Sequence, residues 1–494
     1  MKKLIITTTA FLAMIYNANA QFVFTKLYNQ CFAFNKVIQN NNEFLSIGLN
    51  VFNNERYFTL IKATLNGNIT NTYDFKQDNQ GSYFYFTGLT KLPDGNFIAV
   101  GQMDDTCFNC ASGILIKINS TFTDTLWTKE YKLAATNDAL LNNLIVCGNG
   151  DFVCCGQTLA SANPFQTQTI LARFDPQGNT IWEKQYNSTH KYNNAIHLSE
   201  TTDGGFMVAG GVNDPGNHKS DALLFKTDSL GNLQWKQEIG GAFADEMANV
   251  QKTNDNKYIV AFVDGIKIGT SPPAEPIKRI NIRKIDLNGT VIWQKYIGKM
   301  KDQVASPQSI NILQNGDILL AGHSSGDAFS GFFKLTANGD SIWYREYVAD
   351  STDIKMGGWS VNQLWACAET TDGGFVCGGG FSGRTGPTGG TQQKAWLLKT
   401  DQNGCQTTQC QNTIGINENK NNAQNIRIYP NPANEYITIE TNNPKQQTIQ
   451  IIDLLGKIWM EKSIHSNEKI TIQELPNAIY IIKTEKQNLL FIKN

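Results

Sequence analysis

The chain has 494 residues, which at roughly 100–200 residues per domain predicts two or three domains. Its 42 Lys and Arg balance 43 Asp and Glu, and only 17% of its residues are charged. Without a basic excess the chain lacks the phosphate-neutralising surface of nucleic-acid-binding proteins, so we expect no nucleic-acid partner. With five His and little charge, we also expect no metal and no cofactor.

Residues 1–20 have the pattern of a secretory signal peptide. Lys2 and Lys3 precede a short apolar stretch, and Ala18-Asn19-Ala20 provides small residues at a cleavage site. The apolar stretch is shorter than the roughly 20 residues that a membrane-spanning helix needs, and no other segment is long enough. We therefore expect Sec export to the periplasm and no transmembrane segment in the mature chain.

Residues 21–410 contain seven copies of one sequence repeat. Its leading aromatic or aliphatic residue recurs every 52 to 60 positions, at Phe44, Phe97, Phe152, Phe206, Tyr258, Ile318 and Phe375. Four residues later, six of the seven copies have glycine, at Gly48, Gly101, Gly156, Gly210, Gly322 and Gly379; the fifth has Phe262. Each copy fits four short strands joined by Asp-Gly or Asn-Gly turns, which favour hairpins. This predicts an all-β fold, a seven-bladed β-propeller.

The fourth strand of most copies carries a tryptophan, as in Trp127-x-Lys129-x-Tyr131, and we expect these tryptophans to pack between blades. The seventh copy lacks this strand, whereas the mature N-terminus has Phe24-x-Lys26-x-Tyr28 with no repeat before it. We therefore predict that residues 22–29 form the missing outer strand of the last blade. Such a strand would close the ring and protect its edges.

Ten cysteines accompany a signal for export, which leads to a compartment where disulfides form. Cys107 and Cys110 share one short loop, and Cys405 and Cys410 flank another, so local disulfides are expected in both. The cysteines within apolar strand patterns are expected to be small buried hydrophobic residues. These are Cys147, Cys154, Cys155, Cys367 and Cys377.

Loops that differ between copies are the expected binding surface, because function is usually carried by variable loops on a repeated scaffold. The residues predicted to bind are Trp359, Arg384, Lys278, Arg279, Asp104 and Asp105. An exposed Trp359 could stack on a sugar or a peptide, but it could equally cover the rim of the ring. Lys278 and Arg279 also fit a solvated loop end. No catalytic residues are predicted, since the match Gly322-x-Ser324-x-Gly326 is followed by a strand pattern where a nucleophile elbow requires a helix.

Residues 411–425 are polar and suit a linker, and residues 426–494 alternate Ile with polar residues, as in a small antiparallel β-sandwich. The latter segment contains, in order, Tyr429-Pro430-Asn431-Pro432, Asp453-Leu-Leu-Gly456-Lys457, Leu475-Pro476 and Ile479-Tyr480. In these motifs it resembles the type A C-terminal sorting domain of the type IX secretion system of Bacteroidetes, with Ala478 where the family usually has glycine. It implies transport by the type IX machinery to the cell surface or the medium.

Together these features favour an exported, non-catalytic propeller that binds a glycan or a surface protein. The alternative is an extracellular hydrolase, lyase or quinone-dependent oxidoreductase with its site in the propeller channel. A cluster of ionisable residues around the channel would favour the enzyme, whereas a channel lined by Asn, Gly and aromatic residues would favour binding.

Overall fold

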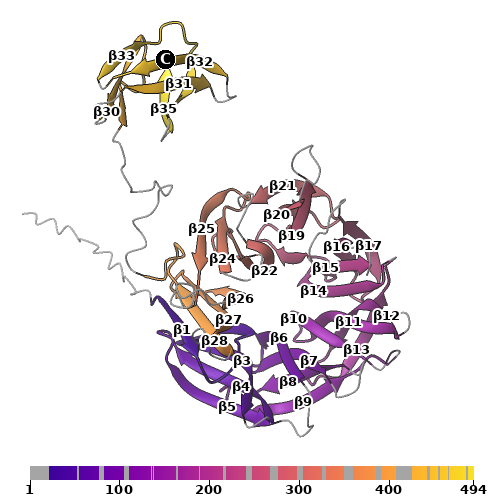
Figure 1. Cartoon of the computed structure of the whole chain (residues 1–494). Coiled ribbons are helices and arrows are strands. Elements are labelled where there is room, and N and C mark those ends of the chain that lie inside the picture. The colour runs from indigo at the N-terminus through magenta and orange to yellow at the C-terminus, as the bar shows by residue number, and fades with distance from the viewer. Residues whose placement is uncertain are drawn as a thin grey trace, which may run out of the picture. The chain divides into compact units, whose positions relative to one another are not determined.

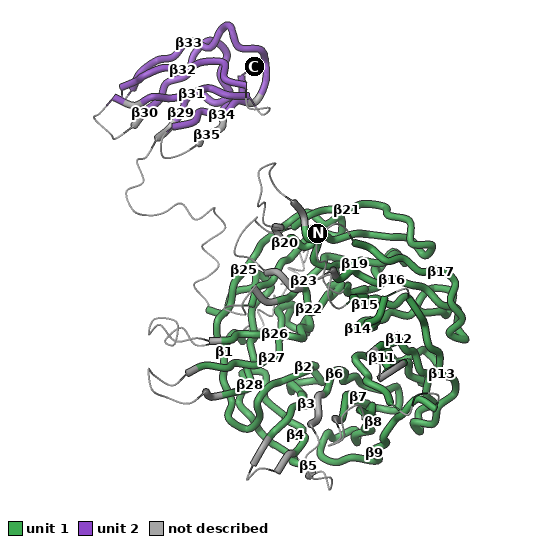
Figure 2. Tube along the Cα trace, turned by 45° about the vertical axis from the view of Figure 1, so that its right-hand side comes forward, with its two compact units in different colours: residues 1–410 green, residues 411–494 purple. Residues whose placement is uncertain are grey.

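The computed structural model describes residues 22–493 except 53–54, 77–82, 105–110, 135, 137, 163–164, 189, 215–218, 241–247, 268–275, 298–303, 325–329, 350–359, 385–390, 408–425, 442–445, 454–456, 466 and 485–487. The segments predicted to be a signal peptide and a linker, residues 1–20 and 411–425, thus lie outside the described residues. The chain divides into two compact units, residues 1–410 and 411–494 (Figure 2). Regular structure in the described part of both units is all β.

The described strands of the first unit form seven four-stranded antiparallel sheets. The first strands of these sheets are β2 (Lys36–Asn40), β6 (Tyr83–Lys91), β10 (Leu140–Val146), β14 (Tyr192–Glu200), β18 (Asn249–Lys252), β22 (Val304–Ile312) and β26 (Ser360–Glu369). The second strands are β3 (Glu43–Phe52), β7 (Phe97–Asp104), β11 (Phe152–Ala162), β15 (Phe206–Asp214), β19 (Tyr258–Lys267), β23 (Ile318–Ser324) and β27 (Phe375–Arg384).

The third strands are β4 (Glu55–Thr64), β8 (Ser112–Ile118), β12 (Phe165–Phe174), β16 (Lys219–Thr227), β20 (Pro276–Ile285), β24 (Ser330–Leu335) and β28 (Thr391–Thr400). The fourth strands are β5 (Ile69–Lys76), β9 (Thr125–Tyr131), β13 (Thr180–Tyr186), β17 (Leu233–Ile239), β21 (Val291–Ile297), β25 (Ser341–Tyr347) and, from the other end of the unit, β1 (Phe24–Tyr28). Each sheet contacts the next, and the last contacts the first through β26, β27 and β2, so the sheets form a propeller-like ring (Figure 1).

Strand β1 pairs antiparallel with β28 in the last sheet, with Phe24 opposite Lys399 and Tyr28 opposite Ala395. This confirms the predicted position of the N-terminal strand. The side chain of Thr25 accepts a hydrogen bond from Trp396 Nε1 at 2.8 Å, which fixes the register from within the sheet. The last sheet is therefore built from both ends of the repeat region.

The tryptophans of the fourth strands pack against the turn glycine of the following sheet, which confirms their predicted place between sheets. These glycines have φ between +73° and +80°, and a Cβ on Gly178, for example, would lie 2.6 Å from the Trp127 ring. The equivalent pairs are Trp182 with Gly231, Trp235 with Gly289, Trp293 with Gly339 and Trp343 with Gly404. Glycine is required at these turns both for the positive φ and for the close approach of the indole.

The N-terminal strand makes the same contacts with the first sheet. The Phe24 ring lies where a Cβ on Gly67 would be, and the Tyr28 hydroxyl donates to the Gly67 carbonyl. Tyr186 and Tyr347 make the equivalent hydrogen bonds, to the carbonyls of Gly231 and Gly404. Phe24-x-Lys26-x-Tyr28 is therefore structurally equivalent to the Trp-x-Lys/Arg-x-Tyr pattern of the other outer strands.

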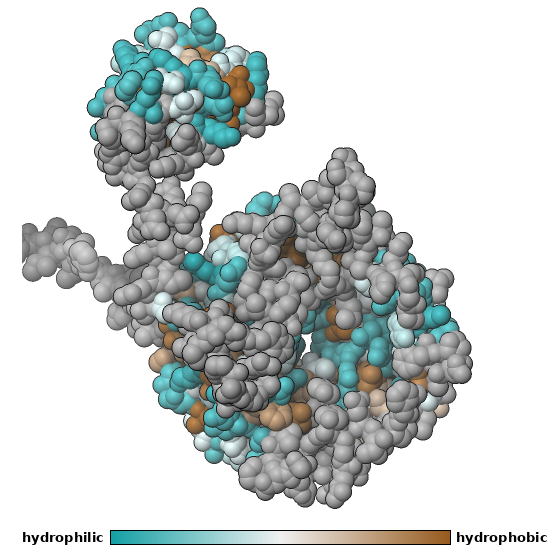
Figure 3. All heavy atoms as spheres, viewed as in Figure 1, coloured by the Kyte–Doolittle hydropathy of each residue, from teal (hydrophilic) through white to brown (hydrophobic). Residues whose placement is uncertain are grey.

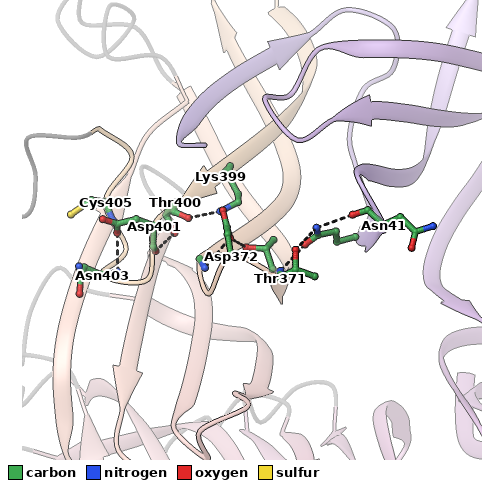
Figure 4. A network of polar contacts seen from close by, with 11 residues as sticks. Asn41, Thr371, Asp372, Lys399, Thr400, Asp401, Asn403 and Cys405 are labelled. Atoms are coloured by element: carbon green, nitrogen blue, oxygen red, sulfur yellow. Dashed lines mark hydrogen bonds and ion pairs between the residues drawn. The ribbon is translucent and has the colours of Figure 1, made fainter. Parts of the chain in front are cut away.

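An ion pair recurs in every sheet, between a basic residue on the third strand and an acidic residue in or beside the first turn. The pairs are Lys62–Glu43, Lys117–Asp94, Arg173–Asp151, Lys226–Asp203, Lys284–Asp255, Lys334–Asp317 and Lys399–Asp372. Lys226 and Lys399 are only 2% and 1% exposed, and their burial is tolerated because each charge has a partner. In the last sheet the pair adjoins Thr371, whose backbone N–H donates to Gln39 of β2 at 2.9 Å and so links the last sheet to the first (Figure 4).

The repeat glycine on the second strand faces a β-bulge in the first strand. In five sheets the register shifts one residue after the position that pairs with this glycine. A Cβ on Gly156, Gly210 or Gly379 would lie within 2 Å of a carbonyl oxygen of the first strand. In the fifth sheet, where Phe262 replaces glycine, the described pairing of the first two strands ends at Ala261, one residue before this position. Glycine therefore recurs because a bulged strand passes where a side chain would be.

Replacing Gly156 with alanine is expected to destabilise the first unit by about 1–3 kcal/mol, because the new Cβ would lie 1.8 Å from Leu140 O and force the backbone apart. Gly148→Ala is the matched control, since that glycine of the same sheet has no atom within 4 Å of the Cβ position. Urea unfolding of both variants measures the difference. Equal midpoints would contradict this account of the glycine.

The second unit contains two antiparallel sheets that share one core. One sheet has the order β29 (Ile426–Tyr429), β30 (Tyr436–Thr441), β33 (Glu468–Thr471); the other has the order β32 (Ile458–Ile464), β31 (Gln447–Asp453), β34 (Ala478–Lys483), β35 (Asn488–Lys493). The core takes Ile437 and Ile439 from the first sheet and Ile451 and Ile482 from the second. Ile therefore alternates with polar residues because one face of each strand packs into the shared core, as the sequence predicts.

The cysteines within strands depart in part from expectation. Cys367 and Cys377 are opposite each other on β26 and β27 and are joined by a disulfide, so the expectation that they are simple buried hydrophobic residues was wrong. Strand alternation cannot detect such a pair, because it depends on the register between two strands. Cys147, Cys154 and Cys155 are buried free thiols, as predicted. Cys405 is buried and disulfide-bonded, whereas Cys107, Cys110 and Cys410 lie outside the described residues.

Candidate binding cavity and sorting domain

A cavity of about 670 Å3 lies within the ring of sheets, and most of its wall comes from the first strands. Side-chain amides dominate this wall, with Tyr192 and Trp365 among the aromatic residues and Lys36, His197 and Asp221 as the ionisable ones. The amide-bearing residues are Asn35, Asn142, Asn143, Gln157, Asn193, Asn194, Asn213 and Gln308. Figure 3 shows hydrophilic residues gathered beside the hollow at the centre of the ring.

The bulges of the first strands place residues on this wall. The residue added at the bulge is Thr87, Asn142, Ile196, Gln308 or Trp365 in the five bulged sheets, and all five line the cavity. A bulge leaves one residue unpaired and redirects its side chain. The repeat glycine and the cavity wall are therefore two consequences of one backbone feature.

Several of these amides form hydrogen bonds from one sheet to the next. Asn142 Nδ2 donates to Asn194 Oδ1 and, at 2.8 Å, to the carbonyl of Ala195, while Gln102 Nε2 donates to Asn142 Oδ1 at 2.6 Å. Thr87 donates in the same way to the carbonyl of Leu141. Since these hydrogen bonds pair the carbonyls of Leu141 and Ala195 and the side-chain amide of Asn142, this part of the wall is held rigidly.

Other amides on the wall keep their hydrogen-bonding capacity. Within the described part of the chain, the side chains of Asn35, Gln157 and Asn213 make no hydrogen bond, although all three line the cavity. Each amide has two donor hydrogens and one acceptor oxygen, the groups that sugar hydroxyls require. The cavity thus combines a fixed polar wall with free donors and acceptors.

His197 on β14 is the histidine of the wall. Burial lowers its pKa to about 3, the positive charge of Lys36 contributes in the same direction, and Asn143 Nδ2 lies 3.3 Å from its Nδ1. The ring is therefore neutral at physiological pH and serves as a hydrogen-bonding group. Burial also lowers the pKa of Lys36.

Because His197 has its pKa lowered in the folded state, acid should weaken the first unit. Between pH 6.5 and about 3 the unfolded chain binds a proton that the folded chain does not, so stability falls as pH falls through this window. We expect His197→Gln to lose about 2 kcal/mol less than the parent between pH 7 and pH 5. Urea unfolding at both pH values tests this, with His465→Gln, in the second unit, as control. A parent and variant with equal pH dependence would contradict the expectation.

Of the residues predicted to bind, Arg279 is described with its side chain, and it is not part of the described cavity wall. Asp104, Arg384 and Lys278 lie on β7, β27 and β20, close to the hairpins between second and third strands. Arg279 lies over the ring of Tyr296, 5.4 Å from its centroid, and donates to the Tyr296 carbonyl at 3.2 Å. Trp359 and Asp105 lie outside the described residues.

Sequence reasoning missed the cavity residues because it searched variable loops rather than the first strands. One signal was available: the doublets Asn142-Asn143 and Asn193-Asn194 stand 14 and 17 residues before Gly156 and Gly210, in consecutive copies. Adjacent polar residues in a strand that is otherwise apolar indicate a bulge or a polar lining. That these residues line one cavity follows from the arrangement of the sheets in a ring, which their spacing in the sequence does not predict.

The motifs of the second unit stabilise its turns. Asp453 accepts hydrogen bonds from Lys457 N and from Trp459 Nε1, both at 2.9 Å, across the turn that contains Gly456, which is itself outside the described residues. Tyr480 is 1% exposed, and its hydroxyl donates to the Pro476 carbonyl at 2.9 Å.

The N-terminal motif of this unit is held to its last strand. Asn431, between Pro430 and Pro432, accepts a hydrogen bond from Ile492 N at 2.9 Å, while Tyr429 is 47% exposed. Ala478 begins β34 in regular structure. Residues 427–494 match the family model of the secretion system C-terminal sorting domain. This segment is a type IX sorting domain.

The sorting domain implies engagement with the type IX secretion machinery and export of the chain to the cell surface or the medium. Among the described residues no helix is long and apolar enough to cross a membrane. The described residues also contain no group of three or more His, Cys, Asp or Glu placed to hold a metal ion.

No curated protein matches the chain. Among solved structures it is similar to PorZ, an essential bacterial surface component of the type IX secretion system of Porphyromonas gingivalis, with 12% identity, a TM-score of 0.41 and coverage of 94% of this chain but 59% of PorZ. It is also similar to the polysaccharide lyase Uly1, with 9% identity, a TM-score of 0.45 and coverage of 79% and 94%. A third similar structure is a GH93 α-L-arabinofuranosidase of Fusarium graminearum, with 12% identity, a TM-score of 0.43 and coverage of 64% of this chain and 93% of the arabinofuranosidase.

Proposed function

We propose that this protein is a glycan-binding module, a seven-bladed β-propeller of residues 21–410 that is closed by its N-terminal strand. In this proposal residues 1–20 are a signal peptide for Sec export to the periplasm, residues 411–425 are a linker, and residues 426–494 carry the propeller through the type IX route of a member of the Bacteroidetes. Glycan binding, without catalysis, takes place in the central cavity.

The cavity wall is the observation that carries this proposal. Sugars are bound in proteins through hydrogen bonds to many hydroxyls and through apolar contact with a ring face. The wall offers free amides on Asn35, Gln157 and Asn213, and aromatic groups on Tyr192 and Trp365. A volume of about 670 Å3 lies within the range of small-ligand sites, about 300–1,000 Å3.

The chemistry of the wall supports binding over hydrolysis of a glycosidic bond. Acid–base catalysis on sugars commonly uses two carboxyl groups close together. The described wall has one carboxylate, Asp221 on β16, together with a neutral His197. We therefore propose binding without catalysis, in a cavity lined mainly by amides. In this proposal the variable loops that hold Trp359 and Arg384 form a second, outer contact surface.

A glycan array probed with the mature chain tests the function. We expect binding that is lost on Trp365→Ala and weakened at least tenfold by Gln157→Ala, since the two remove a ring face and a free amide. Asn315→Ala changes an exposed residue of the turn between β22 and β23 that does not line the cavity, and it should bind as the parent does. Retained binding in both cavity variants would place the site elsewhere, and binding to surface proteins in place of glycans would overturn the proposal.

A further inference from the structure

Lys36 differs from the paired basic residues of the ring. In every sheet a basic residue of the third strand forms an ion pair beside the first turn, and the most buried lysines, Lys226 and Lys399, follow this rule. Lys36 is on β2 and lines the cavity, and no residue of the described part forms an ion pair or side-chain hydrogen bond with its Nζ. A sheltered ammonium group without a counter-charge is costly in a folded protein.

The position of Lys36 is fixed, and its charge acts on the centre of the cavity. The Ser46 hydroxyl donates to the Lys36 carbonyl at 2.6 Å, which anchors the start of β2. Although Lys36 belongs to the first sheet and His197 to the fourth, the lysine charge lowers the pKa of His197. Lys36 and His197 both line the cavity, so the lysine charge acts across the space that a ligand would occupy.

The remaining ionisable groups of the wall do not neutralise it. The carboxylate on the wall is Asp221 of β16, and no ion pair joins it to Lys36. His197 is neutral, so it can accept or donate a hydrogen bond but carries no charge of its own. The free amides of Asn35 and Gln157 share the wall with Lys36 and can bind neutral hydroxyls.

We propose that Lys36 is the anion-binding residue of the cavity and that the glycan it receives is acidic, with a carboxylated or sulfated sugar placed at Lys36. An acidic sugar supplies the missing counter-charge for the ammonium group and hydroxyls for the amides in a single residue. This inference rests on the proposed glycan binding and adds the class of glycan to it.

Calorimetric titration of the mature chain tests the inference with a matched pair of ligands, tetragalacturonate and its fully methyl-esterified form, and with a sulfated oligosaccharide as a separate arm. We expect one of the acidic ligands to bind at least tenfold more tightly than the uncharged ester, and the better acidic ligand identifies the anionic group. Lys36→Met should reduce binding of the acidic ligand to the level of the ester, and Lys36→Arg should restore most of it. Lys252→Met, on the first strand of another sheet, is the charge control and should change nothing.

The stability of the unliganded variants gives a second readout. Lys36→Met should have a melting temperature equal to or above that of the parent, because it removes a sheltered charge without a partner. A lower melting temperature would assign Lys36 a structural role and overturn the inference. Equal binding of acid and ester, or unchanged acid binding in Lys36→Met, would overturn it while leaving glycan binding intact. Absence of binding to every glycan, acidic and neutral, would overturn the proposed function itself.

Discussion

Removing residues 426–494 is expected to abolish appearance of the protein at the cell surface and in the medium, and to leave it in the periplasm. The physical reason is that the sorting domain has its own core, from Ile437 and Ile439 to Ile451 and Ile482, and is the part that engages the secretion machinery. The first unit keeps all seven four-stranded sheets after the deletion, because each is formed within residues 22–407. Fractionation of cells that express the parent and the truncated chain measures the effect.

A point variant distinguishes recognition from folding in this experiment. Tyr480→Ala removes a fully buried ring that stacks on Phe491, so it should unfold the sorting domain and reproduce the deletion. Tyr429→Ala changes an exposed residue of the N-terminal motif and should leave the fold intact, which makes its export level a direct measure of recognition. Normal amounts of the truncated protein in the medium would show that export does not depend on this domain.

Deleting residues 22–29 is expected to destabilise the first unit by at least about 3 kcal/mol, the second large effect. The deletion removes β1 from the edge of the last sheet, the hydrogen bond from Trp396 to Thr25, and the Phe24 ring at Gly67. The last and first sheets would then meet with an unpaired strand edge and an empty aromatic site. Thermal and urea unfolding of the shortened chain measure the loss, and an unchanged melting temperature would contradict it.

Conservative variants refine this test. Tyr28→Phe and Tyr186→Phe remove the same hydroxyl-to-glycine hydrogen bond, the first at the junction of the last and first sheets and the second at an interior junction. If β1 is equivalent to the other outer strands, each should cost about 1 kcal/mol. A near-zero cost for Tyr28→Phe alone would mean that β1 pairs with its sheet without joining the two sheets.

The repeat and the sorting domain could be predicted from the sequence because both depend on the local order of residues along the chain. The nearly constant spacing of Phe97, Phe152 and Phe206, each with glycine four residues later, defines a repeated unit of four strands without any knowledge of which units are neighbours in space. The position of Phe24-x-Lys26-x-Tyr28 in the last sheet could be predicted in the same way. The seventh copy of the repeat lacks the outer-strand pattern, and the N-terminal segment has this pattern without a repeat before it. The sorting domain was recognisable because its motifs lie at turns, where local residue type decides the backbone.

The cavity depended on the tertiary structure. Asn142 and Asn194 lie 52 residues apart, and their side chains meet only because the ring places β10, with Asn142 at its bulge, against β14 of the next sheet. Lys36 and His197 lie on the first and fourth sheets, and no spacing rule relates them. The disulfide between Cys367 and Cys377 likewise required the register of two strands. The spacing of a repeat and the residue types of a turn depend on residues that are close in the sequence. The residues of a cavity wall are far apart in the sequence, and the closure of the ring sets the distances between them.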